Sequence, residues 1–143
     1  MKPLAELRVE DAMTADPVTI GPEDSLMEAL QLMRLRKIRR VLVVLEGALI
    51  GIVAEGDVKR AEPSTLEVSE QEFNKTMEET QVSRIMIRDP ITVDADVPLK
   101  AAVHTLHTTK FGSLPVLRDG VVVGILTDND VLRVFLEVLE QSG

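Results

Sequence analysis

Apolar residues follow the same sequence of periods twice along the chain. Each pass begins with a short apolar segment after Asp-Pro, at 18–20 and again at 91–93. Proline restricts the preceding residue to extended geometry, so each segment is predicted to be a short strand. Helical spacing of apolar residues then predicts an amphipathic helix from Leu26 and another from Leu99. Two apolar runs joined by a tight turn follow, and a second helix closes the pass. The predicted order in each pass is β-α-β-β-α.

Local signals predict where helices and turns begin. The segment Ser25-Leu26-Met27-Glu28 has the spacing of a capping box, and Pro98 suits the first turn of the corresponding helix in the second pass. Glu46-Gly47 and Asp119-Gly120 separate the paired apolar runs. An Asp-Gly pair in this position favours a type I′ hairpin, because both central residues of that turn need positive φ.

The two passes are one sequence repeated at an offset of 73 residues. From Val9 to Arg60, 15 of 52 positions are identical to their counterparts, with no gap. We therefore divide the chain into a first unit (9–60), a connector (61–81) and a second unit with an extended C-terminal helix (82–138). The two units are expected to pack together and share a core.

The connector is acidic. Between Glu62 and Glu79 it carries six acidic residues and one lysine. A second capping-box spacing begins at Ser69, and Phe73 and Met77 lie four residues apart, so a short helix fixed by these two side chains is predicted. A solvated connector is the simple interpretation, and a docking surface for a basic partner is the alternative.

Composition narrows the class of protein. The net charge of −8 argues against binding to nucleic acid by bulk charge, and the few aromatic residues argue against a stacking platform for single strands. No apolar run approaches the length of a membrane helix, and the N-terminus lacks the pattern of a secretory leader. The chain has no cysteine, which excludes disulfides and thiolate chemistry. We expect a cytoplasmic protein without membrane or nucleic-acid partners.

The motifs at the two ends of each unit resemble those of the CBS domain, named after cystathionine β-synthase. Each unit opens with M-x-x-D-P-[VI]-T-[IV], and the second closes with Gly124-Ile125-Leu126-Thr127-Asp128-Asn129-Asp130. The resemblance covers about residues 9 to 138 and extends to acetoin-utilisation-like proteins made of a CBS pair alone. It implies an α/β fold of two units with pseudo-two-fold symmetry, with the sheets packed together and the helices outside. It also implies a cleft that binds AMP, ADP, ATP or S-adenosylmethionine, and a regulatory role.

Thr127 and Asp130 have two interpretations. Their spacing is that of a capping box at the start of a helix. The same helix N-terminus suits a phosphate, which the Thr127 hydroxyl can also bind, and the Asp130 carboxylate can accept hydrogen bonds from two ribose hydroxyls. The resemblance favours this second interpretation, and capping and binding can coexist. The first unit has Ala54 and Asp57 at these positions, so its site lacks the hydroxyl and Asp57 is a weaker candidate.

A basic run in the first unit adds charge to one predicted site. Its five cations within seven residues are Arg34, Arg36, Lys37, Arg39 and Arg40. The second unit is nearly uncharged at the corresponding positions. A solvated helix end is the alternative interpretation. The resemblance implies crosswise sites, in which the closing motif of one unit faces the opening strand and the residues before the second strand of the other. The basic run would therefore lie beside Thr127 and Asp130 and bind a phosphate tail.

The predicted nucleotide site has apolar walls and polar edges. Its residues are Asp16, Val18, Ile38, Arg39, Ile125, Thr127, Asn129 and Asp130. The weaker second site contains Asp57, Ile91, Phe111 and Gly112, although Phe111 is expected to belong to the core. His104 and His107 have a spacing that can hold a metal, but no third ligand is indicated. We identify no catalytic constellation and expect neither a catalytic cofactor nor a metal.

The sequence thus predicts a regulatory, adenine-nucleotide-binding module that is not an enzyme and acts on an unknown protein. The alternative is a structural dimerisation or docking module whose nucleotide sites have decayed. The closing helix of the second unit has seven apolar residues in the nine positions of Val131–Leu139, more than one buried face requires. We therefore expect a homodimer through this helix. Cover by Phe73 and Met77 of the connector is the alternative.

Overall fold

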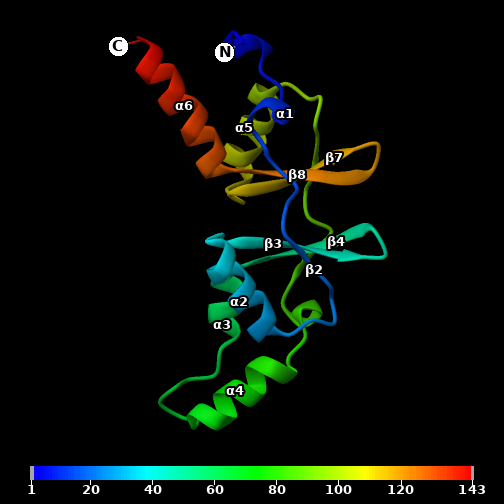
Figure 1. Ribbon diagram of the computed structural model, residues 1–143, viewed down its shortest axis with the longest axis vertical. Helices are drawn as coiled ribbons and strands as arrows, with labels where there is room; N and C mark the ends of the chain where they lie inside the picture. Colours follow the sequence, from blue (N-terminus) through cyan, green and yellow to red (C-terminus); the bar gives the residue numbers. More distant parts are fainter. Residues whose placement is uncertain (1, 143) are drawn as a thin grey trace. The chain divides into compact units, whose positions relative to one another are not determined.

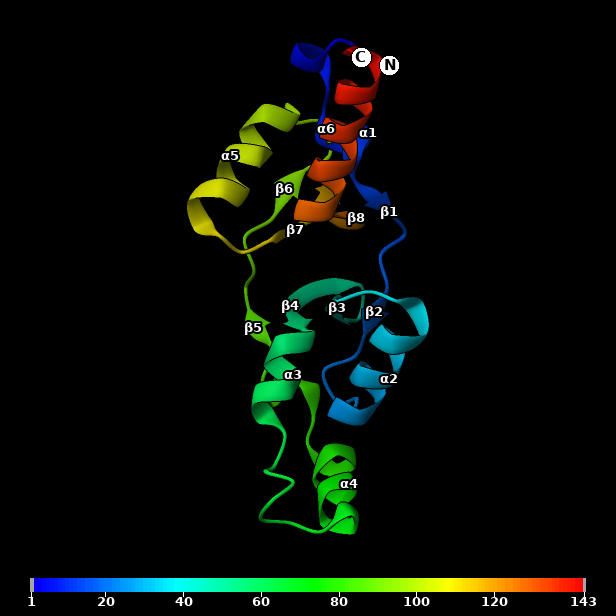
Figure 2. The ribbon, with the colours of Figure 1, turned by 90° about the vertical axis from the view of Figure 1, so that its left-hand side faces the viewer.

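The computed structural model describes residues 2–142, which form two compact units, each with its own four-stranded sheet (Figures 1 and 2). We call them the terminal unit, which contains the described residues up to Pro17 and from Ile91 onward, and the central unit, Val18–Pro90. The fold is mixed α/β, as predicted.

The central unit contains most elements of the first repeat, those of the connector, and the opening segment of the second repeat. In chain order they are β2 (Thr19–Ile20), α2 (Leu26–Arg36), β3 (Arg40–Leu45), β4 (Ala48–Ala54), α3 (Glu55–Ala61), α4 (Glu70–Glu79), the 3-10 turn η2 (Val82–Arg84) and β5 (Ile87–Arg88). The sheet order is β2-β3-β4-β5, in which β2 is parallel to β3 and the other pairs are antiparallel.

The terminal unit repeats this plan with the other half of the chain. Its elements are η1 (Leu4–Glu6), α1 (Val9–Ala12), β1 (Thr14–Ala15), β6 (Val93–Asp94), α5 (Leu99–Thr109), β7 (Ser113–Arg118), β8 (Val121–Thr127) and α6 (Asp128–Ser142). The sheet order is β1-β8-β7-β6, and β6 is parallel to β7.

The opening segments of the two repeats are exchanged between the sheets. Thr14 of the first repeat pairs with Ile125 of the second, and Ile87 of the second pairs with Ile52 of the first. The compact units therefore differ from the repeat boundaries at 9–60 and 82–138, because the chain enters the second sheet with β1 before it forms the first sheet. The sequence repeat alone gives no sign of this exchange.

Both hairpins have the predicted turn. Glu46 and Gly47 have φ of 50° and 82°, and Asp119 and Gly120 have φ of 52° and 79°. Positive φ at both central residues is the type I′ geometry, which matches the right-handed twist of the strands. The predicted hairpins are therefore confirmed.

Each unit buries one face of its first long helix against its sheet. The core of the central unit joins apolar residues of α2, β3 and β4: Leu26, Ala29, Leu30, Met33, Val41, Val43 and Val53. The core of the terminal unit contains the corresponding side chains of α5, β7 and β8, which are Leu99, Ala102, Leu106, Leu114, Val116 and Leu126. Val9 and Val134 complete this core. These are the apolar stripes that the helical and strand periods predict.

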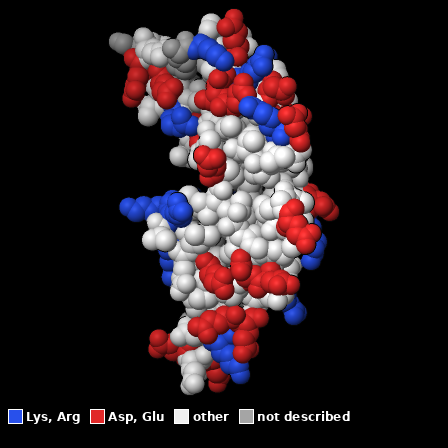
Figure 3. All heavy atoms as spheres, turned by 45° about the vertical axis from the view of Figure 1, so that its right-hand side comes forward, with Lys and Arg blue, Asp and Glu red and all other residues white. Residues whose placement is uncertain are grey.

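The predicted connector helix is α4. The Ser69 hydroxyl accepts a hydrogen bond from the Glu72 amide at 3.1 Å, which caps the helix as predicted. Met77 is fully buried in the core of the central unit, and Phe73 packs partly buried against the same core. The Glu side chains of α4 face solvent and give the surface around this helix its acidic character (Figure 3). No helix within residues 2–142 is long and apolar enough to cross a membrane.

Candidate functional site

The first turn of α6 is built around the Asp130 carboxylate. The Thr127 amide donates to Asp130 Oδ2 at 2.9 Å, and the Asp130 amide donates back to Thr127 Oγ1 at 3.2 Å. This reciprocal pair is a capping box, which satisfies two of the amides that a helix leaves free at its N-terminus. The Thr127 hydroxyl also donates to Asp130 Oδ2 at 3.0 Å. The capping interpretation of the T-x-x-D motif is therefore present in full.

Two residues absent from the predicted site complete the environment of Asp130. The Thr14 hydroxyl donates to Asp130 Oδ1 at 2.9 Å, and Arg133 Nη2 donates to the same oxygen at 3.3 Å. Arg133 also donates to the carbonyl oxygen of Ala12 at 2.7 Å. Asp130 is only 4% exposed, so its buried charge is compensated by these donors. Asp130 thus connects α6 and β8 to the opening segment of the first repeat.

The sequence contained a signal for both of these residues. Arg133 is identical to its counterpart Arg60, and the offset of 73 places Ile87 opposite Thr14. The hydroxyl of Thr14 is therefore specific to one of the two sheets. Its role depends on the exchange of opening segments, because only that exchange brings Thr14 next to Asp130 within the terminal unit.

The first turn of α3 in the central unit has fewer hydrogen bonds to its aspartate than the first turn of α6. The Ala54 amide donates to Asp57 Oδ2 at 2.9 Å, but Ala54 has no side-chain oxygen to return the bond. Arg60 forms an ion pair with Asp57 at 2.5 Å, as Arg133 does with Asp130. Ile87 occupies the place of Thr14 and has no hydroxyl. Asp57 thus has two fewer hydroxyl donors than Asp130 and is also less buried.

The basic run lies at the end of α2 and the start of β3. Lys37 ends the helix in the left-handed conformation, and the Arg39 carbonyl accepts a hydrogen bond from the Glu55 amide at 2.7 Å. The pKa of Glu55 is held below its ordinary value by a hydrogen bond from Lys59 and by the positive charges of Lys59, Arg39 and Arg34. Basic side chains project from the central unit in Figure 3.

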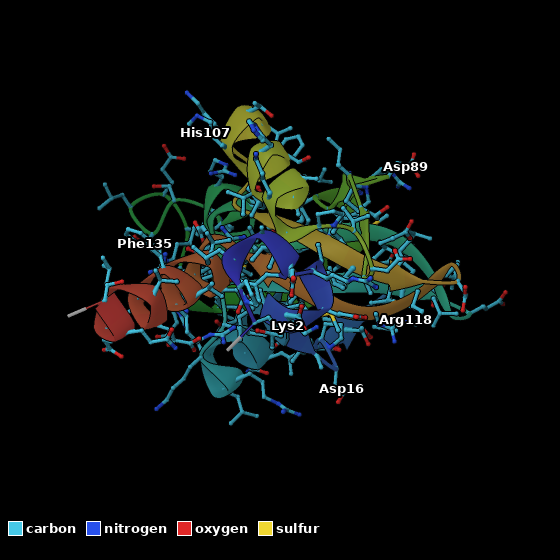
Figure 4. All side chains as sticks on the ribbon, turned by 90° about the horizontal axis from the view of Figure 1, so that it is seen from above. Lys2, Asp16, Asp89, His107, Arg118 and Phe135 are labelled. Atoms are coloured by element: carbon cyan, nitrogen blue, oxygen red, sulfur yellow. The ribbon has the colours of Figure 1, made fainter. Side chains whose placement is uncertain are left out.

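The other predicted residues divide between the two units. Val18 and Ile38 are partly buried and pack against the core of the central unit. Arg39 and Asp57 belong to the same unit but not to its core. The terminal unit holds Asp16, Ile91, Phe111, Gly112, Ile125, Thr127, Asn129 and Asp130. The exposed side chain of Asp16 points away from the terminal unit (Figure 4). The predicted site therefore draws on both units, and its assembly stays a prediction.

Phe111 corrects one expectation. It was expected to belong to the core, yet it is 53% exposed. Phe111 follows the helix-ending residue Lys110, and Gly112 beside it has φ of 75°, so this loop carries the ring outside the packed face of the sheet. The Gly112 carbonyl accepts a hydrogen bond from the Asp128 amide at 3.0 Å, as the Arg39 carbonyl does from the Glu55 amide.

Among residues 2–142 no group of three potential ligands is placed to hold a metal ion, and His104 and His107 are exposed on α5.

Comparison with known proteins identifies the family. A family model for the CBS domain matches residues 9–64 and 82–137, and the chain belongs to the CBS domain family. A CBS domain-containing protein of Dictyostelium discoideum is 32% identical over 136 residues, which cover 92% of this chain and 93% of that protein. The resemblance inferred from the motifs is confirmed.

Solved structures agree with this assignment. A putative acetoin utilization protein (AcuB) from Vibrio cholerae has a TM-score of 0.81 and 32% identity, covering 96% of this chain and 97% of that one. CBSX2 from Arabidopsis thaliana has been solved in complex with AMP; that complex has a TM-score of 0.75 and 29% identity over 92% of this chain and 97% of its own.

Other relatives are larger proteins. The inosine-5′-monophosphate dehydrogenase of Korarchaeum cryptofilum is 34% identical over 125 residues, which are 87% of this chain but 23% of that enzyme. The chain likewise spans 46% of a similar protein of Methanocaldococcus jannaschii.

Proposed function

We propose that this protein is a regulatory module that binds an adenosine-containing ligand, either an adenine nucleotide or S-adenosylmethionine, and modulates a partner protein. The observation that carries the proposal is the complete Thr127-x-x-Asp130 motif at the N-terminus of α6. Two similar proteins support the ligand class, since one was solved with AMP and another with 5′-methylthioadenosine and S-adenosyl-L-methionine.

The proposed chemistry assigns one role to each group. The positive end of the α6 helix dipole and the Thr127 hydroxyl bind phosphate, because the dipole favours negative charge at the helix N-terminus. Asp130 accepts the ribose hydroxyls. We assign Arg39 to the phosphate tail, because the cations of the basic run occur in one repeat only and are not required by the fold. Val18, Ile38 and Ile125 supply apolar surface for the base, with Asp16 and Asn129 at its edge.

A regulatory role is favoured over catalysis. The segment that this chain shares with the inosine-5′-monophosphate dehydrogenase of Korarchaeum cryptofilum makes up only 23% of that enzyme. The described residues contain no arrangement of nucleophile, base and orienting group around Asp130, whose neighbours are two threonines and an arginine. The partner is proposed to be a protein that responds to the occupied and unoccupied states.

Calorimetry with AMP, ADP, ATP and S-adenosylmethionine tests the proposal. A ligand at a hundred times its dissociation constant should also stabilise the fold by about 2.7 kcal/mol in a thermal unfolding experiment. Asp130→Asn should weaken binding by about tenfold or more, whereas Asp57→Asn, the matched control in the other repeat, should have a smaller effect. Absence of binding by all four ligands, or a greater loss from Asp57→Asn, would contradict the proposal.

A structural dimerisation module is the second candidate function. It is favoured by the burial of Asp130 and by an apolar stripe on α6 that faces solvent: Leu132, Phe135, Leu136 and Leu139. Figure 4 shows the Phe135 side chain on the outside of this helix. The alternative cover by the connector is wrong, because Phe73 and Met77 pack in the core of the central unit while the stripe stays exposed. We propose a homodimer through α6, which is compatible with both functions.

A further inference from the structure

The Asp130 carboxylate has no free acceptor position. An ionised carboxylate offers about four lone-pair sites on its two oxygens. Oδ1 accepts from Thr14 and Arg133, while Oδ2 accepts twice from Thr127, through its amide and its hydroxyl. A ribose diol that binds Asp130 must therefore replace two of these donors.

The four donors differ in how easily they can leave. The Thr127 amide is fixed by the backbone at the start of α6, so its bond persists as long as the helix is capped. The Thr127 hydroxyl can turn from Oδ2 towards a phosphate by rotation about one bond. At Oδ1, Arg133 forms the longer bond and is held by Ala12, whereas the Thr14 hydroxyl forms the shorter one.

Thr14 is the donor at Oδ1 that a ribose hydroxyl can replace most readily. It belongs to β1, a strand of two residues at the edge of the terminal sheet, and the residue is exposed. Its hydroxyl is an aliphatic alcohol, the same chemical group as a ribose hydroxyl. It therefore occupies Oδ1 with the same donor chemistry that a ribose hydroxyl would bring.

We propose that Thr14 is an internal competitor for the ligand, a regulation of the nucleotide site that rests on the proposed function. In the free protein its hydroxyl fills the ribose position on Asp130, and binding of the nucleotide displaces it. Because Thr14 lies on the opening segment of the first repeat, its release changes how that segment is held to α6. The central unit lacks this device, since Ile87 stands in the corresponding position.

The test compares two variants that differ in the hydroxyl alone. Thr14→Val removes the competing donor and keeps the branched shape of the side chain, so AMP should bind more tightly, by about tenfold or more, as expected for loss of one hydrogen bond to a charged group. Thr14→Ser retains the hydroxyl and should bind AMP as the unchanged protein does. Calorimetry measures both affinities, and Asp130→Asn shows whether the bound AMP uses this carboxylate.

A second measurement uses the unchanged protein. Three-bond couplings to the Thr14 methyl group report its χ1 rotamer, which should change when AMP is added. If Asp130→Asn abolishes binding but Thr14→Val leaves the affinity unchanged or weaker, or the rotamer stays the same, the competition is wrong and the proposed function stands. If neither the unchanged protein nor Thr14→Val binds AMP, ADP, ATP or S-adenosylmethionine, both are wrong.

Discussion

The carbonyl oxygen of Thr14 passes so close to Gly124 that a β-carbon on this glycine would lie 2.9 Å from it and 2.5 Å from Met13 Sδ. The same contact occurs in the central unit, where a β-carbon on Gly51 would lie 3.0 Å from the Ile87 carbonyl. Each glycine thus permits the opening segment of the other repeat to join its sheet. This explains why the methionine and the glycine recur together in both repeats.

Replacing Gly124 should therefore detach β1. The backbone oxygen of Thr14 cannot move without breaking its pairing with β8, so Gly124→Ala should destabilise the protein by about 1–3 kcal/mol. Gly56→Ala is the matched control, because Gly56 lies in helix α3 and its β-carbon would meet only the end of the Arg60 side chain. That substitution should be neutral or stabilising. Urea denaturation measures both, and equal effects would contradict the role assigned to Gly124.

Asp130 and Asp57 should differ in their contribution to stability. Asp130→Ala removes the acceptor for Thr14, Thr127 and Arg133, whereas Asp57→Ala removes the acceptor for Ala54 and Arg60 only. We expect a loss of about 2–3 kcal/mol for Asp130→Ala and about 1 kcal/mol for Asp57→Ala. Unfolding without ligand measures this difference. Equal losses would mean that the Thr14 bond contributes nothing in solution.

Arg39 should distinguish a nucleotide from its nucleoside. If its guanidinium meets phosphate, Arg39→Ala should weaken ATP and AMP by about tenfold and leave adenosine nearly unchanged. Salt should reduce the preference of the unchanged protein for ATP, because exposed charges are screened. Lys75→Ala, which removes an exposed cation of α4 outside the basic run, is the control and should leave the affinities for ATP, AMP and adenosine unchanged. Parallel losses for AMP and adenosine would place Arg39 away from the phosphate.

Local features were predictable from the sequence, and the long-range exchange was not. The type I′ hairpins, the Ser69 cap and the burial of Met77 follow from residue chemistry within a few positions. The Thr127–Asp130 pair was predictable for the same reason. The bond between Thr14 and Asp130 joins residues 116 positions apart and depends on which sheet takes β1. No local propensity determines that choice, because either sheet offers an equivalent edge and an equivalent glycine.

The stripe on α6 gives the prediction of self-association. Val131 and Val134 face the core of the terminal unit, while Leu132, Phe135, Leu136 and Leu139 recur at helical spacing on an exposed face, with Phe135 56% exposed. A contiguous apolar face of this kind marks an interface, because leaving it in water costs about 25 cal/mol per Å². Light scattering should therefore report a dimer, about twice 15.8 kDa, at tens of micromolar. Phe135→Ser with Leu139→Ser should shift it to monomer without unfolding it, since neither side chain is buried. Leu66→Ser, which alters a side chain 96% exposed outside the stripe, is the control and should stay dimeric. A monomeric unchanged protein, with or without nucleotide, would refute the interface.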